Sequence, residues 1–240
     1  MLKRRTKRMA IAAAVVTAGC LILVPAPARA GDLDDVLAAF DEAQASVQTL
    51  SASFVQTTTN PMLKTPIQAE GSFFMTKPDA IRWEYRTPEE MSFVIANDRY
   101  TGYYPARKRA EKKNVQRYSK KIFRYFGMGQ KSSELTKSYD IRLAEPQQGA
   151  DRYHVLILEP KKRRARKRVD EVRFWLDDKS YLPVKVEYLG SDGSTRVVEF
   201  TEINVNPDLS ASTYNVVIPA DVTVTTGFSG LPSVSSESSQ

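Results

Sequence analysis

Hydrophobic positions along this chain repeat with two different periods. From Asp32 to Leu50, apolar residues recur at helical spacing, and three aspartates stand in the first turn, where the helix dipole favours negative charge. This pattern predicts an amphipathic helix over residues 32–50. After Leu50 the period drops to two, which is typical of strands that bury one face.

The segments with a period of two follow one another at short spacing. In Ile81–Tyr85, apolar side chains alternate with charged ones, and turn sequences such as Lys77-Pro78-Asp79 and Ser191-Asp192-Gly193 separate successive segments. No connection between the early strands is long enough for a crossover helix, so we expect antiparallel pairing. The predicted strands lie near residues 53–57, 69–76, 81–85, 91–96, 100–104, 139–145, 153–159, 169–176, 184–189, 196–203 and 209–224.

These elements predict an α+β fold with one large antiparallel sheet of about 10–11 strands. The apolar segment 120–127 predicts a short internal helix. A twisted sheet of this size tends to curl, and a helix can lie across its concave face. The Trp, Phe, Tyr, Met and Ile side chains between helix and sheet then form either a filled core or an open groove, and periodicity alone leaves both alternatives open.

The two ends of the chain differ in amino-acid composition from the segment between them. Residues 1–30 have a basic start, an apolar stretch from Met9 to Val24 and the small-residue motif Ala28-Arg29-Ala30, which together predict a cleavable secretory signal. Residues 227–240 are rich in serine and poor in apolar residues, so we expect a disordered tail. The expected folded domain spans residues 31–226.

Net charge and the content of cysteine and histidine limit the kinds of functional site that the protein can have. The leader has six basic residues and no acidic ones, so the net charge of +7 falls to +1 after cleavage, which argues against nucleic-acid binding. Cys20 is the only cysteine and lies in the leader, and His154 is the only histidine. Thiolate catalysis and a Cys/His zinc site, which needs several such ligands, are therefore excluded from the mature chain. A Ser-His-Asp triad would have to use His154, which the surrounding apolar alternation places along a strand. We expect no catalytic residue, no metal and no cofactor.

Several motifs resemble the outer-membrane lipoprotein carrier family, LolA, over about residues 32–224. They are Leu50–Gln56 after the first helix, Gly71–Tyr85 with its Pro-x-x-x-x-Trp pattern, the hairpin from Asn97 to Pro105, and Thr213–Val222. The resemblance implies an unclosed antiparallel half-barrel with helices as a lid. It also implies a periplasmic carrier that takes acylated lipoproteins from an inner-membrane ATP-driven (ABC) transporter and passes them to an outer-membrane acceptor, where one exists.

The resemblance assigns roles to particular residues. The expected lid contacts are Lys77, Phe123 and Phe126, and Lys77 stands where the family often has arginine. We expect a monomer. The side chains expected to bind acyl chains are Phe54, Phe73, Met75, Ile81, Trp83, Tyr85, Phe93, Ile95 and Phe174.

A basic loop between two predicted strands has no counterpart in the family pattern. Seven of its eight residues are basic, and we expect it to dock on a membrane or a partner through its charge, the alternative being a solvated hairpin tip. The seven are Lys161, Lys162, Arg163, Arg164, Arg166, Lys167 and Arg168.

Two other functions fit the same architecture. One is a lipid-sensing periplasmic regulatory module, which usually has a second domain. The other is a lipidated outer-membrane acceptor, for which Cys20 in Thr17-Ala18-Gly19-Cys20 would be the attachment point. An enzyme is disfavoured, because Glu84, Glu89 and Glu90 lack a partner carboxylate in the pattern.

Processing of the leader gives the first prediction. Because Ala28 and Ala30 satisfy the small-residue requirement, the mature protein should begin at Gly31. Intact-mass measurement of protein from its native envelope checks this, and a diacylglycerol group on Cys20 would instead favour an anchored acceptor.

Overall fold

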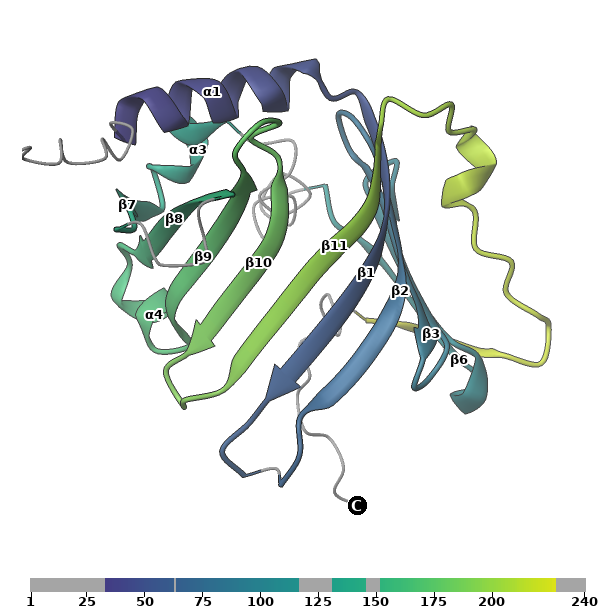
Figure 1. The fold of residues 1–240 in the computed structure, drawn as a ribbon. Helices are drawn as coiled ribbons and strands as arrows, with labels where there is room; N and C mark the ends of the chain where they lie inside the picture. The colour runs from purple at the N-terminus through teal and green to yellow at the C-terminus, as the bar shows by residue number, and fades with distance from the viewer. Residues whose placement is uncertain (1–32, 63, 117–130, 146–151, 228–240) are drawn as a thin grey trace, which may run out of the picture.

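The computed structural model describes residues 33–62, 64–116, 131–145 and 152–227, which form one curved sheet with short helices at its margins (Figure 1). The helices are α1 (Leu33–Ser46), η1 (Pro105–Arg107), α3 (Ser132–Leu135), α4 (Arg163–Arg166) and η3 (Ala211–Tyr214). The strands are β1 (Thr49–Thr59), β2 (Ile67–Thr76), β3 (Ala80–Thr87), β4 (Met91–Ala96), β5 (Arg99–Tyr104), β6 (Arg109–Asn114), β7 (Tyr139–Leu143), β8 (Tyr153–Pro160), β9 (Val169–Asp177), β10 (Pro183–Gly190), β11 (Thr195–Val205) and β12 (Thr223–Thr226).

The strands form a single open sheet in the order β12-β6-β5-β4-β3-β2-β1-β11-β10-β9-β8-β7. Neighbouring strands pair antiparallel except β12 and β6, which pair parallel. The first and last strands of this order do not pair, so the sheet is curved but not closed. This architecture confirms the predicted unclosed antiparallel fold with an N-terminal helix.

The described residues form twelve strands, and the expected final strand is wrong over most of its length. Of the range 209–224, only residues 223 and 224 lie in a strand, β12 (Thr223–Thr226). The preceding chain crosses the outer face of β3, where Arg82 donates hydrogen bonds to the carbonyls of Thr213 and Asn215 at 3.1 and 3.2 Å. The strand β6 was missed because most of its side chains are charged.

Alternation along the strands separates an inner face from an outer one. In β1 every second side chain from Leu50 to Thr58 is buried, and β2 and β3 continue the same alternation. The helix α1 lies across the end of the sheet where β1 begins and buries Val36 and Phe40 (Figure 1). The inner face and α1 therefore share one apolar core.

The predicted helix over residues 32–50 is too long at its C-terminal end. It ends at Ser46, and the buried residues Val47 and Leu50 lie beyond it, Leu50 already in β1. The side-chain amide of Asn206 explains this end. Its oxygen accepts hydrogen bonds from the backbone N–H groups of Gln48 and Thr49 at 2.7 and 3.3 Å, and its nitrogen donates to the Ser46 carbonyl at 3.0 Å.

None of the short helices η1, α3, α4 and η3 was predicted from the sequence. The helix expected over residues 120–127, with Phe123 and Phe126, lies outside the described residues, as do the leader and residues 228–240. The helix α3 is joined to α1, because Asp41 accepts hydrogen bonds from the backbone N–H and the hydroxyl of Ser132 at 2.5 and 2.7 Å.

The junction at Asn206 generates a stability prediction. Replacing Asn206 by Gly removes three hydrogen bonds and should lower the free energy of unfolding by about 1–2 kcal/mol. Asn206→Ala should cost about 1 kcal/mol more, because residue 206 has a φ of 58° that disfavours a Cβ atom. Urea unfolding measures both values. Equal stability of the two variants and the wild type would show that this junction does not hold α1.

Candidate functional site

All nine residues expected to bind acyl chains lie on the inner face and belong to one hydrophobic core. They come from five strands, and none exposes more than 3% of its surface. By strand they are Phe54 on β1, Phe73 and Met75 on β2, Ile81, Trp83 and Tyr85 on β3, Phe93 and Ile95 on β4, and Phe174 on β9. Folding thus brings together the whole set that the family resemblance implied.

Aromatic rings in this set touch one another. The Trp83 ring lies 4.7 Å from that of Phe54 and 4.9 Å from that of Phe73, measured between ring centroids. Phe200 of β11, which was not predicted, lies 5.9 Å from Trp83. Contacts at these distances are those of a packed core. The inner face is therefore filled by its own side chains at these positions.

The inner face changes in character along the strands. Beside α1, strand pairing aligns Leu50, Met75, Ile81 and Ile95 in one row of apolar side chains. The next row contains Phe73, Trp83 and Phe93. Toward the other end of β1 the inward positions become polar, first at Gln56 and then at Thr58.

This polar end was missed by the sequence analysis, although its residues occupy inward positions in the period of two. The Tyr85 hydroxyl donates to the Gln56 side-chain oxygen at 2.9 Å, and the Gln56 amide donates to the Thr58 hydroxyl at 3.5 Å. Arg196 of β11 lies opposite Thr58, and its guanidinium carbon stands 5.9 Å from the centre of the Tyr188 ring. Burial raises the pKa of Tyr85 well above its usual value, and the nearby Arg196 charge opposes that rise.

Lys77 lies between β2 and β3, next to α1. Its ammonium group donates a hydrogen bond to the Gln44 carbonyl near the end of α1, and its backbone N–H donates to the Gln48 carbonyl at 2.9 Å. Burial lowers the pKa of Lys77. The residue predicted as a lid contact thus joins the sheet to the N-terminal helix.

The seven residues of the basic loop are exposed, and four residues of the loop form α4. Lys161 is held by a hydrogen bond to the Thr136 carbonyl at 2.7 Å and lies 3.5 Å from the Asp140 carboxylate. Ser191 of the β10–β11 turn donates to the Lys167 carbonyl at 2.8 Å. The basic loop therefore stands at the end of the sheet remote from α1, beside that turn (Figure 1).

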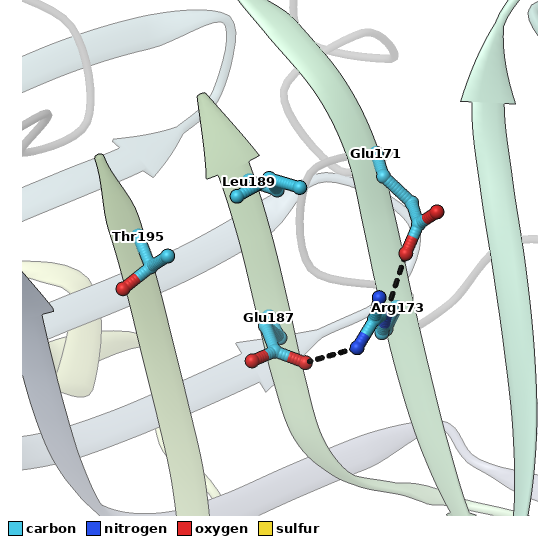
Figure 2. A pocket seen from close by; sticks show the side chains of 5 residues that line it. All are labelled: Glu171, Arg173, Glu187, Leu189 and Thr195. Carbon is cyan, nitrogen blue, oxygen red and sulfur yellow. Dashed lines mark hydrogen bonds and ion pairs between the residues drawn. The ribbon is translucent and has the colours of Figure 1, made fainter. Parts of the chain in front are cut away.

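The outer face carries charge pairs instead of apolar rows. Figure 2 shows Arg173 between Glu171 and Glu187, to which it forms ion pairs. These side chains line a shallow depression of about 60 Å³ together with Leu189 and Thr195. Small-molecule sites usually have about 300–1,000 Å³, so this depression is too small to hold a lipid.

No cluster of His, Cys, Asp and Glu that could hold a metal occurs among the residues that the structure describes. His154 stacks on Tyr181 with the ring centroids 5.1 Å apart. Within the described ranges, no helix has the length and apolar character that a membrane span requires.

This chain is similar to one curated protein in sequence and to several solved structures. The outer-membrane lipoprotein carrier protein of Bordetella avium (strain 197N) is 27% identical over 206 residues, which are 85% of this chain and 92% of that protein. An uncharacterised conserved protein from Thermus thermophilus has a similar fold, with a TM-score of 0.53 at 13% identity over 81% of this chain and 98% of that one. MucB in the Pseudomonas aeruginosa MucA/MucB complex is a more distant likeness, with a TM-score of 0.45 at 18% identity over 85% of this chain and 68% of the matched chain.

The family model described as "Outer membrane lipoprotein carrier protein LolA" matches residues 45–217. The match runs from the end of α1 through the polar and apolar rows of the inner face to the segment that crosses β3. With the open antiparallel sheet and the gathered aromatic side chains, it shows that this chain belongs to the LolA family of outer-membrane lipoprotein carrier proteins.

Proposed function

We propose that this protein is a periplasmic carrier that holds the acyl chains of lipoproteins against the inner face of its sheet and moves them from the inner to the outer membrane. The observation that carries the proposal is the gathering of nine large apolar side chains on one face of an open sheet. Family membership and the Bordetella avium relative support the same role. Carriage needs no catalytic residue, so we propose no enzymatic activity.

Burial of hydrocarbon supplies the affinity. Each buried CH₂ group stabilises the complex by about 0.8 kcal/mol, and the aromatic rows offer an apolar surface for it. The free energy of binding is reduced by the cost of uncovering these rows, because they are packed in the unliganded protein. A carrier benefits from this balance, since cargo held too tightly is not released.

We propose that α1 is part of the lid. Its polar attachments to the described structure include the bond from Lys77 to Gln44, the bonds between Asp41 and Ser132, and the Asn206 junction. Val36 and Phe40 add apolar contacts. These attachments hold an amphipathic helix to the end of the sheet and leave a small set of bonds to break when cargo enters.

The basic loop fits a docking role. Charges on exposed side chains attract an anionic surface by about 1 kcal/mol per basic residue within a Debye length. Three further basic residues, on and near β6, are each paired with a carboxylate. There Arg107 pairs with Glu89, Lys108 with Asp221 and Arg109 with Glu111. We assign docking to the loop, because all seven of its basic residues are exposed and follow one another closely in the sequence.

The proposed partners follow from the carrier role. They are acylated lipoproteins as cargo, the inner-membrane lipoprotein-releasing ABC transporter as donor and, where one exists, an outer-membrane acceptor. We propose that the protein works as a monomer, because the inner face is covered within one chain.

A pair of neighbouring substitutions tests the inner face. Ile95 points inward and Val94 outward on β4, and both are almost fully buried. Ile95→Thr puts a hydroxyl group on the proposed binding surface and should weaken binding of a fluorescent fatty-acid analogue about tenfold. Val94→Thr puts the same group under the outer segment and should leave affinity unchanged.

Denaturant unfolding of both variants supplies the control. Each variant should lose stability, because each buries a hydroxyl group. Equal loss of affinity in the two variants would attribute the effect to stability and remove the support for an acyl-binding inner face.

Replacing the seven basic residues of the loop by Ser tests docking. We expect unchanged fatty-acid affinity but slower uptake of lipoprotein from inner-membrane vesicles at low salt. The difference should vanish near about 1 M salt, where the Debye length is about 3 Å. A variant with all seven positions as Lys keeps the charge and should behave like the wild type. Equal uptake rates for the Ser variant and the wild type at low salt would identify the loop as a solvated tip.

A further inference from the structure

The polar end of the inner face has a positive charge without a counter-charge. Nε of Arg196 is buried and has no hydrogen-bond partner in the structure, and the Arg196 side chain is only partly exposed. No ion pair joins Arg196 to a carboxylate of the described residues. A buried donor on a charged group that lacks an acceptor is costly, and such groups cluster at functional sites.

The side chains around Arg196 cannot neutralise it. Its inward neighbour on β11 is Val198, and Tyr188 of β10 presents the face of its ring. Thr58, opposite Arg196, is buried and accepts a hydrogen bond from Gln56, so its own O–H remains to be donated. The cluster thus combines a partly exposed guanidinium group, whose Nε is buried, with a buried hydroxyl donor.

We propose that, besides lipoprotein acyl chains, the inner face takes anionic lipids, whose carboxylate or phosphate head binds this cluster while the acyl chain lies along the aromatic rows toward α1. The inference rests on the proposed acyl-binding face and adds the polarity and direction of the ligand. Strand register supports the direction. Eight residues of β1 separate Leu50, in the row beside α1, from Thr58, which is about 27 Å of extended chain.

The surroundings of the cluster favour the same ligand. Ser191 of the β10–β11 turn contacts the basic loop through the Lys167 and Arg168 carbonyls, and Arg196 lies just inside the strand that follows this turn. The basic loop and Arg196 therefore lie at the same end of the sheet. An anionic head group that is attracted to the loop meets Arg196 next.

Ligand choice by the wild-type protein is the first test and needs no variant. We expect a fatty acid and a lysophosphatidic acid of the same chain length to bind at least tenfold more tightly than the neutral fatty-acid methyl ester. A preference for only one of the two anionic lipids would identify carboxylate or phosphate as the head group. Equal affinity for all three would overturn the head-group site, while binding of the ester would still support the acyl-binding face. Failure of all three to bind would overturn both.

Arg196→Met is the second test, with Arg142→Met on the outer face as the matched control. Arg196→Met should lose the preference for anionic lipids and keep the affinity for the ester. It should unfold at no lower urea concentration than the wild type, because it removes an uncompensated charge. Arg142→Met should keep the preference. An equal loss of affinity for ester and acid in Arg196→Met, or an unchanged preference, would contradict the proposal.

Discussion

The fold depends on covering one apolar face of a single curved sheet. A sheet buries side chains on alternate positions, and here no second sheet packs on the inner face, within the described residues, to complete the core. The rings of Phe54, Phe73 and Trp83 are nevertheless almost completely buried. The cover comes in part from the curvature of the sheet and from α1 at its end. A cover made of separate elements can part from the sheet without loss of strand pairing, which is the physical basis for a carrier.

The two faces of the sheet divide stability and function between them. On the outer face, Glu171, Arg173 and Glu187 compensate one another, and the segment around Thr213 covers β3 through bonds from Arg82. These contacts serve the folded chain itself. On the inner face, apolar rows give way to polar side chains toward Arg196.

Much of this arrangement could be predicted from the period of two. Alternation in β1 to β4 identifies nearly every side chain of the predicted acyl-binding set, because a half-buried strand leaves a strong signal. The end of α1 could not be found this way, since Leu50 fits a helical stripe and a strand equally well, and Asn206, which caps that end, is 160 residues away from Ser46. The strand β6 has charged side chains on both faces and therefore no apolar alternation.

The polar part of the site was harder to predict for a related reason. A strand pattern assigns charged residues to the solvent-facing side of a sheet. The pattern alone therefore predicts that Arg196, at the start of β11, is exposed. Its inward direction follows only from register with Thr58 and Tyr188, which pairing between distant segments decides. Gln56 and Thr58 did carry a signal, because they are polar residues at inward positions of an otherwise apolar alternation.

Photo-crosslinking of cargo tests the acyl-binding face most directly. A lipoprotein with a photoreactive group in its acyl chain would be loaded onto the protein, irradiated, and mapped by mass spectrometry. We expect crosslinks on the inward residues of β2 to β4, such as Met75, Trp83 and Phe93, and none on the outer face at Trp175. Crosslinks confined to the outer face or to the basic loop would contradict a carrier that holds acyl chains against the inner face of its sheet.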